Sequence, residues 1–370
     1  MDFELSEERQ MLKDTAERFI REQYPIEKRH AATKSEHGFD REIWAEFCDL
    51  GLVGALVPPE AGGYGGSGED IALVFEALGR GVVVEPFLPT LLAAVPLVAA
   101  GREDIIAAAM EGQMQLAFAH VEPGAYYAES HVEAVAEDRD GWKISGKKAV
   151  VINGATADHL VVTARVSGAG DDKEGLGLFL VAAGDGVAAQ DHASIDGPHV
   201  AEITLDKAAA EPLGTPGADW PLIEKSLAAG TLAVSAEAIG AMDVAKDMTV
   251  DYLKDRKQFG KPIGANQVLQ HRMVDILLEI EQARSAVMLA ANTFEAERDL
   301  RELNISAAKN LVGRSGRLVA EESIQMHGGV AMTWEWPLPH FAKRLVMIDH
   351  LFGDTDHHLT RFIALTKKNS

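Results

Sequence analysis

The first part of the chain has the pattern of an amphipathic helix. Apolar residues recur there at three- and four-residue steps: Met11, Leu12, Ala16, Phe19 and Ile20. This spacing places them on one face of a helix. Ser6 is a favoured N-cap residue, and the acidic Glu7 and Glu8 have the sign of charge that the first turn of a helix prefers. We therefore predict a helix that begins just after Ser6.

More helical structure is predicted in the rest of this first part. The apolar run from Phe39 to Leu50 predicts a helix that ends at Gly51. The glycine-rich loop Pro58–Gly66 lacks the Lys-Ser/Thr pair of a phosphate-binding loop, so we predict a structural turn before a helix near Glu69. A glutamate and three prolines interrupt the apolar stretch Val82–Ala100. We predict packed helix and turn there, not a membrane span.

The pattern changes from about residue 114. Residues 131–137 alternate polar and apolar side chains, which predicts a half-buried strand. Asp140 and Gly141 predict a hairpin turn that leads into a strand at Trp142. Further strands are predicted at Leu160–Ala164 and Leu178–Val181, with a glycine-rich loop Gly168–Gly175 between them. This middle part is therefore expected to be a small β domain.

From about Trp220 the pattern is helical again. One helix is predicted from the stripe Leu269, Met273, Ile276, Ile280, Ala283, Val287 and Ala291. Another is predicted from a flank formed by Leu303, Ala307, Leu311 and Leu318, with the small Ser315 on the same face. No proline lies between Ile263 and Trp336. Long amphipathic helices of this kind predict a bundle with spare faces for oligomer contacts.

These patterns together predict an α+β fold with three consecutive domains. We expect a helical N-terminal domain at residues 1–113, a β domain at 114–214 and a C-terminal domain with a four-helix bundle at 215–370. The length of 370 residues is long for one hydrophobic core and suits two or three domains.

Composition narrows the possible partners. The formal net charge of -22 disfavours nucleic acid and anionic membranes, and an anionic substrate such as a CoA ester would need a local basic pocket. The single cysteine, Cys48, cannot form an intrachain disulfide, which suits the cytoplasm, and its apolar surroundings predict a buried thiol. The acidic N-terminus does not have the pattern of a signal peptide. No His/Cys/Asp cluster has metal-ligand spacing, so we predict no metal.

Five segments along the whole chain resemble motifs of the acyl-CoA dehydrogenase family. They are Arg256-Lys257-Gln258-Phe259-Gly260, Gln325-Met326-His327-Gly328-Gly329, Glu122-Pro123-Gly124, Asn153-Gly154 after Gly146-Lys147-Lys148, and Pro59 to Gly63 with one fewer intervening residue. Taken singly, an Arg-Lys pair is usually solvated surface and Gly-Gly is usually a helix end. Together and in this order they identify the chain as a member of that family.

The resemblance implies FAD as the cofactor, bound across a subunit interface. It assigns the cofactor-binding positions to Arg256, Gln258, Phe259, Gln325, Gly328, Gly329, Thr355 and His357. The chemistry agrees with this assignment. A pyrophosphate needs charged and amide donors, which an arginine supplies, and glycines let backbone approach a ligand closely.

The chain departs from the family where catalysis takes place. The family base is a glutamate, and Gly353 stands at its usual position. A minority of members carry the base ten residues before a glycine that here resembles Gly240, and that position holds Gly230, followed by Thr231 where an arginine is usual. The residues beside the flavin ring are also changed, to Val150-Val151-Ile152, and Val121 replaces a threonine.

This combination resembles the non-catalytic subunits of heteromeric acyl-CoA dehydrogenases, above all the pimeloyl-CoA dehydrogenase small subunit. It implies an acyl-CoA substrate of the dicarboxylic or steroid side-chain type, a related partner subunit that carries the base, and an electron-transfer flavoprotein as acceptor. Two alternatives remain open. The chain could be a homomeric dehydrogenase with Asp354 as the base, or a flavin monooxygenase or oxidase on the same fold.

Overall fold

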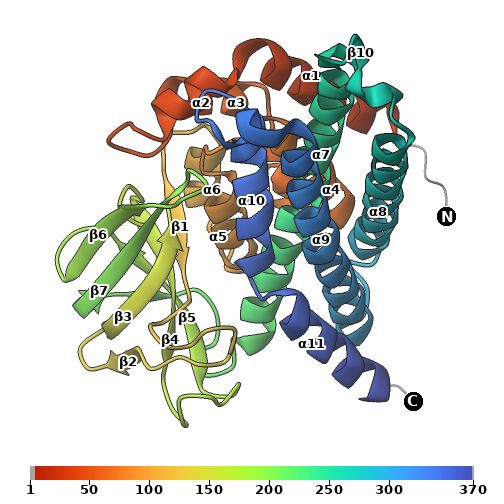
Figure 1. Ribbon diagram of the computed structural model, residues 1–370. Helices are drawn as coiled ribbons and strands as arrows, with labels where there is room; N and C mark the ends of the chain where they lie inside the picture. Colours follow the sequence, from red (N-terminus) through yellow and green to blue (C-terminus); the bar gives the residue numbers. More distant parts are fainter. Residues whose placement is uncertain (1–4, 369–370) are drawn as a thin grey trace. The chain divides into compact units, whose positions relative to one another are not determined.

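The chain forms two compact units in the computed structural model, which describes residues 5–368. The sheet unit comprises Glu27–Gly66 and Val84–Gly230, and the helical unit comprises the residues up to Ile26, Ser67–Val83 and the residues from Thr231 on. The chain passes from one unit to the other inside the long helix α7 (Trp220–Asp255) (Figure 1). Helices combined with a sheet confirm the predicted α+β class. The domain boundaries at residues 113 and 214 stay predictions, because the compact units follow a different division.

Within residues 5–368, eight strands form one sheet in the order β6-β7-β3-β2-β4-β5-β8, with β1 paired in parallel to β4. Their bounds are β1 (Leu116–Ala119), β2 (Val135–Asp138), β3 (Trp142–Ile152), β4 (His159–Arg165), β5 (Leu176–Ala182), β6 (Val187–Ala193), β7 (His199–Ala209) and β8 (Glu211–Pro212). The predicted strands at Leu160–Ala164 and Leu178–Val181 are confirmed as β4 and β5. Asp140 and Gly141 both have positive φ at the turn between β2 and β3, which confirms the predicted hairpin.

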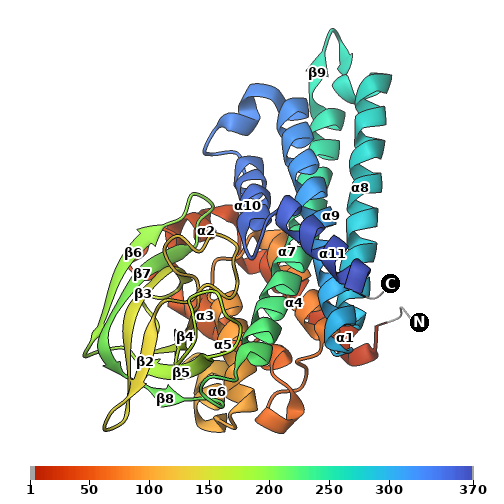
Figure 2. The ribbon, with the colours of Figure 1, turned by 90° about the horizontal axis from the view of Figure 1, so that it is seen from below.

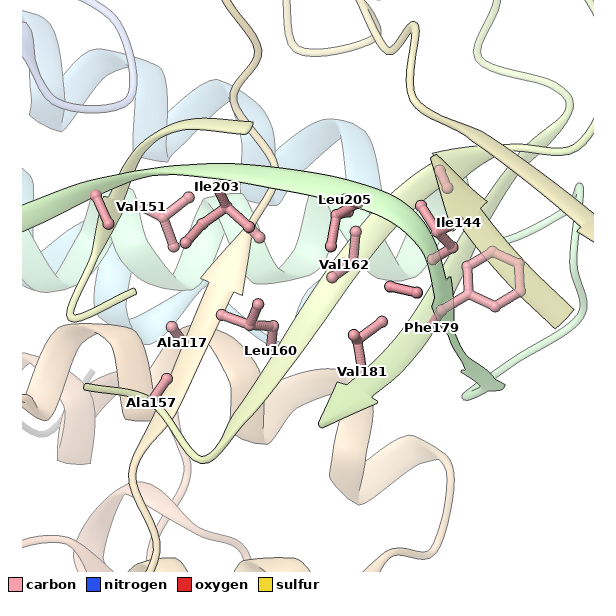
Figure 3. Packing of buried hydrophobic residues seen from close by; sticks show 14 of the residues in the cluster. Ala117, Ile144, Val151, Ala157, Leu160, Val162, Phe179, Val181, Ile203 and Leu205 are labelled. Carbon is pink, nitrogen blue, oxygen red and sulfur yellow. The ribbon is translucent and has the colours of Figure 1, made fainter. Parts of the chain in front are cut away.

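Alternate side chains of these strands meet in one apolar core. Figure 3 shows Val151, Leu160, Val162, Phe179 and Ile203 packed together between the strands. Residues two apart on a strand point to the same face, so a small set of valines, leucines and isoleucines is enough to build this core.

Helices complete the sheet unit. They are α2 (Ile26–Ala32), α3 (Arg41–Asp49), α5 (Phe87–Ala99) and α6 (Glu103–Met110), with short 3₁₀ turns at Gly54–Leu56 and Pro59–Ala61. α3 confirms the helix predicted to end at Gly51, and α5 confirms packed helix in the apolar stretch that precedes residue 100. Cys48 is buried in α3, and burial raises the pKa of its thiol to about 12, as expected for a structural cysteine.

The strand predicted at residues 131–137 is wrong in its first half, because β2 begins only at Val135. Other partners take the backbone groups just before it. The carboxylate of Glu122 accepts the N–H groups of Glu133 and Ala134, and Arg165 donates to the carbonyl oxygen of Val132. Alternation alone could not reveal these competing hydrogen bonds.

The helical unit is built from long helices. They are α1 (Glu7–Gln23), α4 (Gly68–Gly81), most of α7, α8 (Gln267–Asn292), α9 (Arg298–His327), α10 (Leu338–His350) and α11 (Thr355–Lys368), with 3₁₀ turns at Ile263–Ala265 and Gly328–Met332 and a two-stranded hairpin of β9 (Lys257–Gln258) and β10 (Lys261–Pro262). The side chain of Ser6 accepts from the N–H of Arg9, which confirms the predicted cap of α1. α9 packs against α8, α10 and α11 (Figure 2).

The buried face of α9 differs from the predicted one. Leu303, Ala307, Leu311 and Leu318 are only partly buried. The fully buried stripe contains Ile305, Ala308, Lys309, Val312 and Val319. Lys309 occupies one of the inward positions, where a charged residue is not expected, so hydrophobic periodicity does not indicate this face.

α4 and α7 cross so closely that their contact points are glycines. A Cβ atom on Gly79 would overlap the carbonyl oxygen of Glu237, and one on Gly240 would overlap that of Glu76. Charged side chains flank the crossing. Arg284 on α8 donates to Glu76 and to Asp243, both at 2.7 Å, and Arg344 on α10 forms a buried bidentate pair with Glu237 at 2.6 and 2.7 Å.

α7 is long and apolar enough to cross a membrane, with a mean hydropathy of 1.3 over its most apolar window. However, 94% of that window is buried inside the protein. Burial of this extent is typical of a core helix, so the apolar character of α7 is explained by packing.

The α4–α7 crossing predicts that Gly240→Ala lowers the free energy of unfolding by about 1–3 kcal/mol or more, because the new methyl group overlaps backbone that cannot rotate away. Gly316→Ala on α9 is the matched control, since its nearest neighbour would lie at 3.6 Å. Gly316→Ala should raise the free energy of unfolding by about 0.5–1 kcal/mol, because alanine has a higher helix propensity than glycine. Denaturant unfolding of both variants checks this, and equal effects would contradict the crossing.

Candidate functional site

The first predicted FAD segment lies at the end of α7. Arg256 directly follows the last residue of that helix, and Gln258 and Lys261 pair across the β9–β10 hairpin. Phe259 and Gly260 form its two-residue turn with φ of 52° and 80°, the backbone of a type I′ hairpin. The side chain of Phe259 is 101% exposed, and Arg256 and Gln258 are exposed as well. The segment therefore offers a guanidinium, an amide and an aromatic ring to a ligand.

The second predicted segment ends α9. Gln325 is exposed in the last turn, and Gly328 caps the helix with φ 68° and ψ -145°, a conformation that is open almost only to glycine. A Cβ atom on Gly328 or Gly329 would meet nothing within 4 Å. The two glycines thus leave open space in front of backbone N–H groups, which suits a phosphate or ribose.

An aromatic stack brings the two segments together. Tyr252, in the turn of α7 before Arg256, stacks on His327 with ring centroids 4.4 Å apart, and Trp336 packs against both rings. Because His327 is the last residue of α9, this stack fixes the arginine segment beside the glutamine segment. The residues present at this corner of the helical unit fit the adenosine and pyrophosphate half of FAD.

The position at which the resemblance places the catalytic base lies in the turn between α10 and α11. Gly353 is buried and has φ 106°, and Phe352 before it also has a positive φ of 58°. Gly353 thus occupies the left-handed region that favours glycine. Neither Gly353 nor Gly230, which is buried in the interior of α7 beside the buried Thr231, supplies a carboxylate.

Asp354 and Thr355 are engaged at the start of α11. The Oδ1 atom of Asp354 accepts the N–H of His357 at 2.9 Å, so its carboxylate caps the helix. The hydroxyl of Thr355 donates to Oδ1 of Asp349 at 2.9 Å. Any role of Asp354 as a base, or of Thr355 and His357 in cofactor binding, stays a prediction.

Lys309 reaches this turn from the buried face of α9. Its side chain is fully buried, and Nζ donates to the carbonyl oxygens of Asp349 at 2.9 Å and of Gly353 at 2.7 Å. Burial lowers the pKa of Lys309 to about 8, although Asp349 and Asp354 act in the opposite direction. The turn is thus anchored by a buried ammonium group.

A second buried lysine organises the flavin-loop motif of the sheet unit. Nζ of Lys148 donates to Glu122 Oε1 at 2.6 Å, to the carbonyl oxygen of His120 at 3.2 Å and to Thr163 Oγ1 at 3.1 Å. All three N–H donors of the ammonium are therefore used. Glu122 in turn holds the backbone at residues 133 and 134. The Lys148–Glu122 ion pair thus fixes the start of the Glu122-Pro123-Gly124 loop.

His120 extends this buried network. Nδ1 of His120 lies 3.1 Å from Oγ1 of Thr163, the same hydroxyl oxygen that accepts from Lys148. The ring also forms a hydrogen bond with the backbone of Glu129. Burial, and next the charge of Lys148, lower the pKa of His120 to about 3. The ring is neutral at physiological pH.

The β3 strand that resembles the family's flavin strand is strained. Its pairing with β7 shifts register between Lys148 and Val151, and Val150 lies at this bulge with φ 53° and 54% of its surface exposed. A positive φ is costly for a β-branched residue and persists only where the surroundings impose it. The bulge directs an aliphatic side chain outward where the resemblance places a tryptophan.

Sequence reasoning missed the two lysines and the aromatic stack. Tyr252 had a signal, because it precedes Arg256 by one helical turn. Lys309 also had one, since it shares helical spacing with Ile305 and Val312. Among residues 5–368, no group of three or more His, Cys, Asp or Glu side chains could hold a metal ion.

Comparisons with known proteins agree with these motifs. Residues 6–112 match the family model described as acyl-CoA dehydrogenase, N-terminal domain, and residues 218–364 match acyl-CoA dehydrogenase, C-terminal domain. Acyl-CoA dehydrogenase IpdE2 of Mycolicibacterium smegmatis is 30% identical over 97% of this chain and 99% of its own length. The solved structure of a variant of the Tcur3481-Tcur3483 steroid ACAD is 28% identical, covers 98% of both chains and has a TM-score of 0.89.

The buried His120 predicts a loss of stability in acid. Its folded pKa of about 3 lies below the ordinary value of 6.5, so between these values the unfolded chain binds a proton that the folded chain does not. The free energy of unfolding should fall as pH drops through this window, by up to about 1.4 kcal/mol per pH unit. His120→Gln should flatten this limb, and the exposed His192→Gln should not. Melting curves from pH 4 to 7 check this, and parallel curves for all three proteins would refute it.

Proposed function

The chain is a member of the acyl-CoA dehydrogenase family, and on that premise we propose that it is a subunit of a heteromeric enzyme. In this role it completes the FAD site of a related partner subunit that carries the catalytic base. The family consists of FAD-dependent oxidoreductases that act on CH–CH groups. The proposal concerns how this chain contributes to that chemistry.

The single observation that carries the proposal is the conformation of Gly353. A glycine with φ 106° occupies the place of the family's glutamate, and the alternative place also holds a glycine, Gly230. Abstraction of the α proton of an acyl-CoA needs a base within hydrogen-bond reach, and both family positions lack one.

The residues proposed to hold FAD are, by contrast, complete. We assign its adenosine and pyrophosphate half to Arg256, Gln258, Phe259, Gln325, Gly328 and Gly329, and place Thr355 and His357 near the flavin half. When bound, FAD supplies the acceptor for the β hydrogen. This chain's own part is to bind and orient that cofactor with a guanidinium and with backbone N–H groups at glycines. A supporting subunit requires the FAD-binding residues but not a catalytic base of its own, which is the combination proposed here.

The comparisons support this choice in two ways. IpdE2, which this chain matches over almost its whole length, is an acyl-CoA dehydrogenase, and the similar solved structure is that of the Tcur3481-Tcur3483 steroid ACAD. Those properties belong to those proteins. Similarity to the steroid ACAD favours steroid side-chain CoA esters, and the sequence resemblance favours dicarboxylic acyl-CoAs such as pimeloyl-CoA, so these two classes are the first substrates to test. We further propose an electron-transfer flavoprotein as acceptor and the cytoplasm as location.

Two alternatives predict different outcomes. In a homomeric enzyme Asp354 would be the base, although its carboxylate caps α11. A flavin monooxygenase or oxidase on this fold would need no carboxylate and would consume oxygen.

Arg256→Ala should weaken FAD retention without unfolding the chain. Loss of one charge-assisted contact to a phosphate costs about 1.5–3 kcal/mol, or roughly ten- to a hundredfold in affinity. Flavin content after gel filtration and the melting temperature check this. Arg314→Ala, an exposed arginine on α9, is the control. Release of FMN in place of FAD on heating, or unchanged flavin content in Arg256→Ala, would contradict the assignment.

The purified chain should show little or no acyl-CoA turnover with an artificial electron acceptor, and should gain it when co-expressed with a partner that carries a glutamate base. Absence of a general base typically lowers the rate by about 10²–10⁴. Asp354→Asn removes the carboxylate but keeps a good N-cap, so activity of the mixed complex should not change.

Three results would point elsewhere. Robust turnover by the chain alone that is lost in Asp354→Asn would establish a homomeric enzyme with Asp354 as base. Oxygen consumption without acyl-CoA dehydrogenation would establish an oxidase or monooxygenase. A homo-oligomer that is saturated with FAD and does not assemble with any partner would also contradict a heteromeric role.

A further inference from the structure

The turn that contains Gly353 has no room for a side chain at that residue. A Cβ atom built on Gly353 would lie 2.5 Å from Cδ2 of His357 and 3.0 Å from Nε2 of His358. Contacts this short do not occur between real carbon atoms, so even an alanine requires the ring of His357 to move. The φ of 106° adds backbone strain for any residue with a Cβ atom.

Side chains from two helices hold this turn in place. The N–H of His358 Nε2 donates to the carbonyl oxygen of Phe352 at 3.0 Å, and Nζ of Lys309 donates to that of Gly353 at 2.7 Å. Oδ1 of Asp349 also accepts from the N–H of Thr355 at 3.1 Å. The positive φ of Phe352, a residue with a Cβ atom, carries backbone strain that these contacts offset.

We propose that the turn Phe352–Thr355 excludes a catalytic carboxylate from position 353 by its geometry, because His357 fills the space that a side chain there needs and Lys309 holds the turn in this form. The proposal rests on the proposed function and deepens it. His357 and Lys309 are positioning residues in this account. The chain lacks a base because the turn is remodelled around glycine, and the substitution Gly353→Glu alone does not restore one.

A pair of glycine substitutions separates the blockage from backbone strain. Gly141 has φ 99°, close to that of Gly353, but a Cβ atom there would meet nothing within 4 Å. Gly353→Ala should therefore lower the melting temperature of the FAD-loaded protein clearly more than Gly141→Ala does. Equal shifts in the two variants would overturn the proposal.

Removal of the His357 ring tests which group causes the blockage. In the background of His357→Ala, the additional penalty of Gly353→Ala over Gly141→Ala should disappear. If Gly353→Ala alone does not fold, recovery of a folded protein in this background supports the proposal, and failure to recover overturns it. This comparison is a double-mutant cycle, so the intrinsic cost of His357→Ala cancels.

A third experiment measures the turnover of pimeloyl-CoA by Gly353→Glu with an artificial electron acceptor. We expect no turnover above that of the unmodified chain. Turnover from Gly353→Glu alone would overturn the exclusion while leaving the supporting-subunit role intact. Turnover by the unmodified chain would instead overturn that role, so the two failures are distinguishable.

Lys309→Met tests whether the lysine holds the turn, because the substitution keeps the length of the side chain but removes the N–H donors to residues 349 and 353. Backbone amides from residue 353 to 358 should exchange with deuterium at least several-fold faster. Lys343→Met on α10, whose ammonium lies over the ring of Trp334, is the control and should leave these amides unchanged. Unchanged exchange in Lys309→Met would show that the lysine does not hold the turn.

Discussion

An ammonium group buried away from water must find acceptors for its N–H groups, and this requirement shapes both units of the protein. Leaving such donors unpaired costs several kcal/mol, so the surrounding backbone adopts whatever conformation supplies oxygen atoms. In the sheet unit Lys148 donates hydrogen bonds to Glu122, to the carbonyl oxygen of His120 and to Thr163. In the helical unit Lys309 gathers the carbonyl oxygens of residues 349 and 353. Each lysine therefore fixes the backbone of a segment in which the resemblance places functional residues.

The two lysines solve this problem differently. Lys148 is neutralised by Glu122, whereas Lys309 donates to the carbonyl oxygens of residues 349 and 353, with the carboxylates of Asp349 and Asp354 nearby. Burial lowers both pKa values, so both charges depend on fixed partners and neither segment can move without exposing an unsatisfied donor or acceptor. Strained residues are found beside these anchors, Val150 next to the first and Phe352 next to the second. Strain of this kind persists where the surrounding contacts outweigh it.

Much of the fold could be predicted from periodicity, capping and turn chemistry. The cap at Ser6, the hairpin at Asp140-Gly141 and the strands around Leu160 and Leu178 depend on neighbours in the sequence, and local rules describe such features well. The first half of the strand at 131–137 and the inward face of α9 could not be predicted. Glu122, Arg165 and Lys309 decide them through contacts between residues that are distant in the chain. The candidate FAD residues were recognisable as motifs, but the stack of Tyr252 on His327 that joins them was not.

A missing glutamate in a sequence is usually understood as the loss of one chemical group. Here the same position also has a backbone conformation that disfavours every residue except glycine. The next residue, Asp354, accepts the N–H of His357 with its Oδ1 atom and so caps α11. The turn that favours glycine at position 353 therefore also uses the adjacent carboxylate as a helix cap. The hairpin corner with Arg256 and Gly328 depends on none of these contacts, since its groups are exposed and held by the aromatic stack. The proposed cofactor residues and the proposed base position therefore depend on separate sets of contacts, which is what the proposed role as a supporting subunit requires.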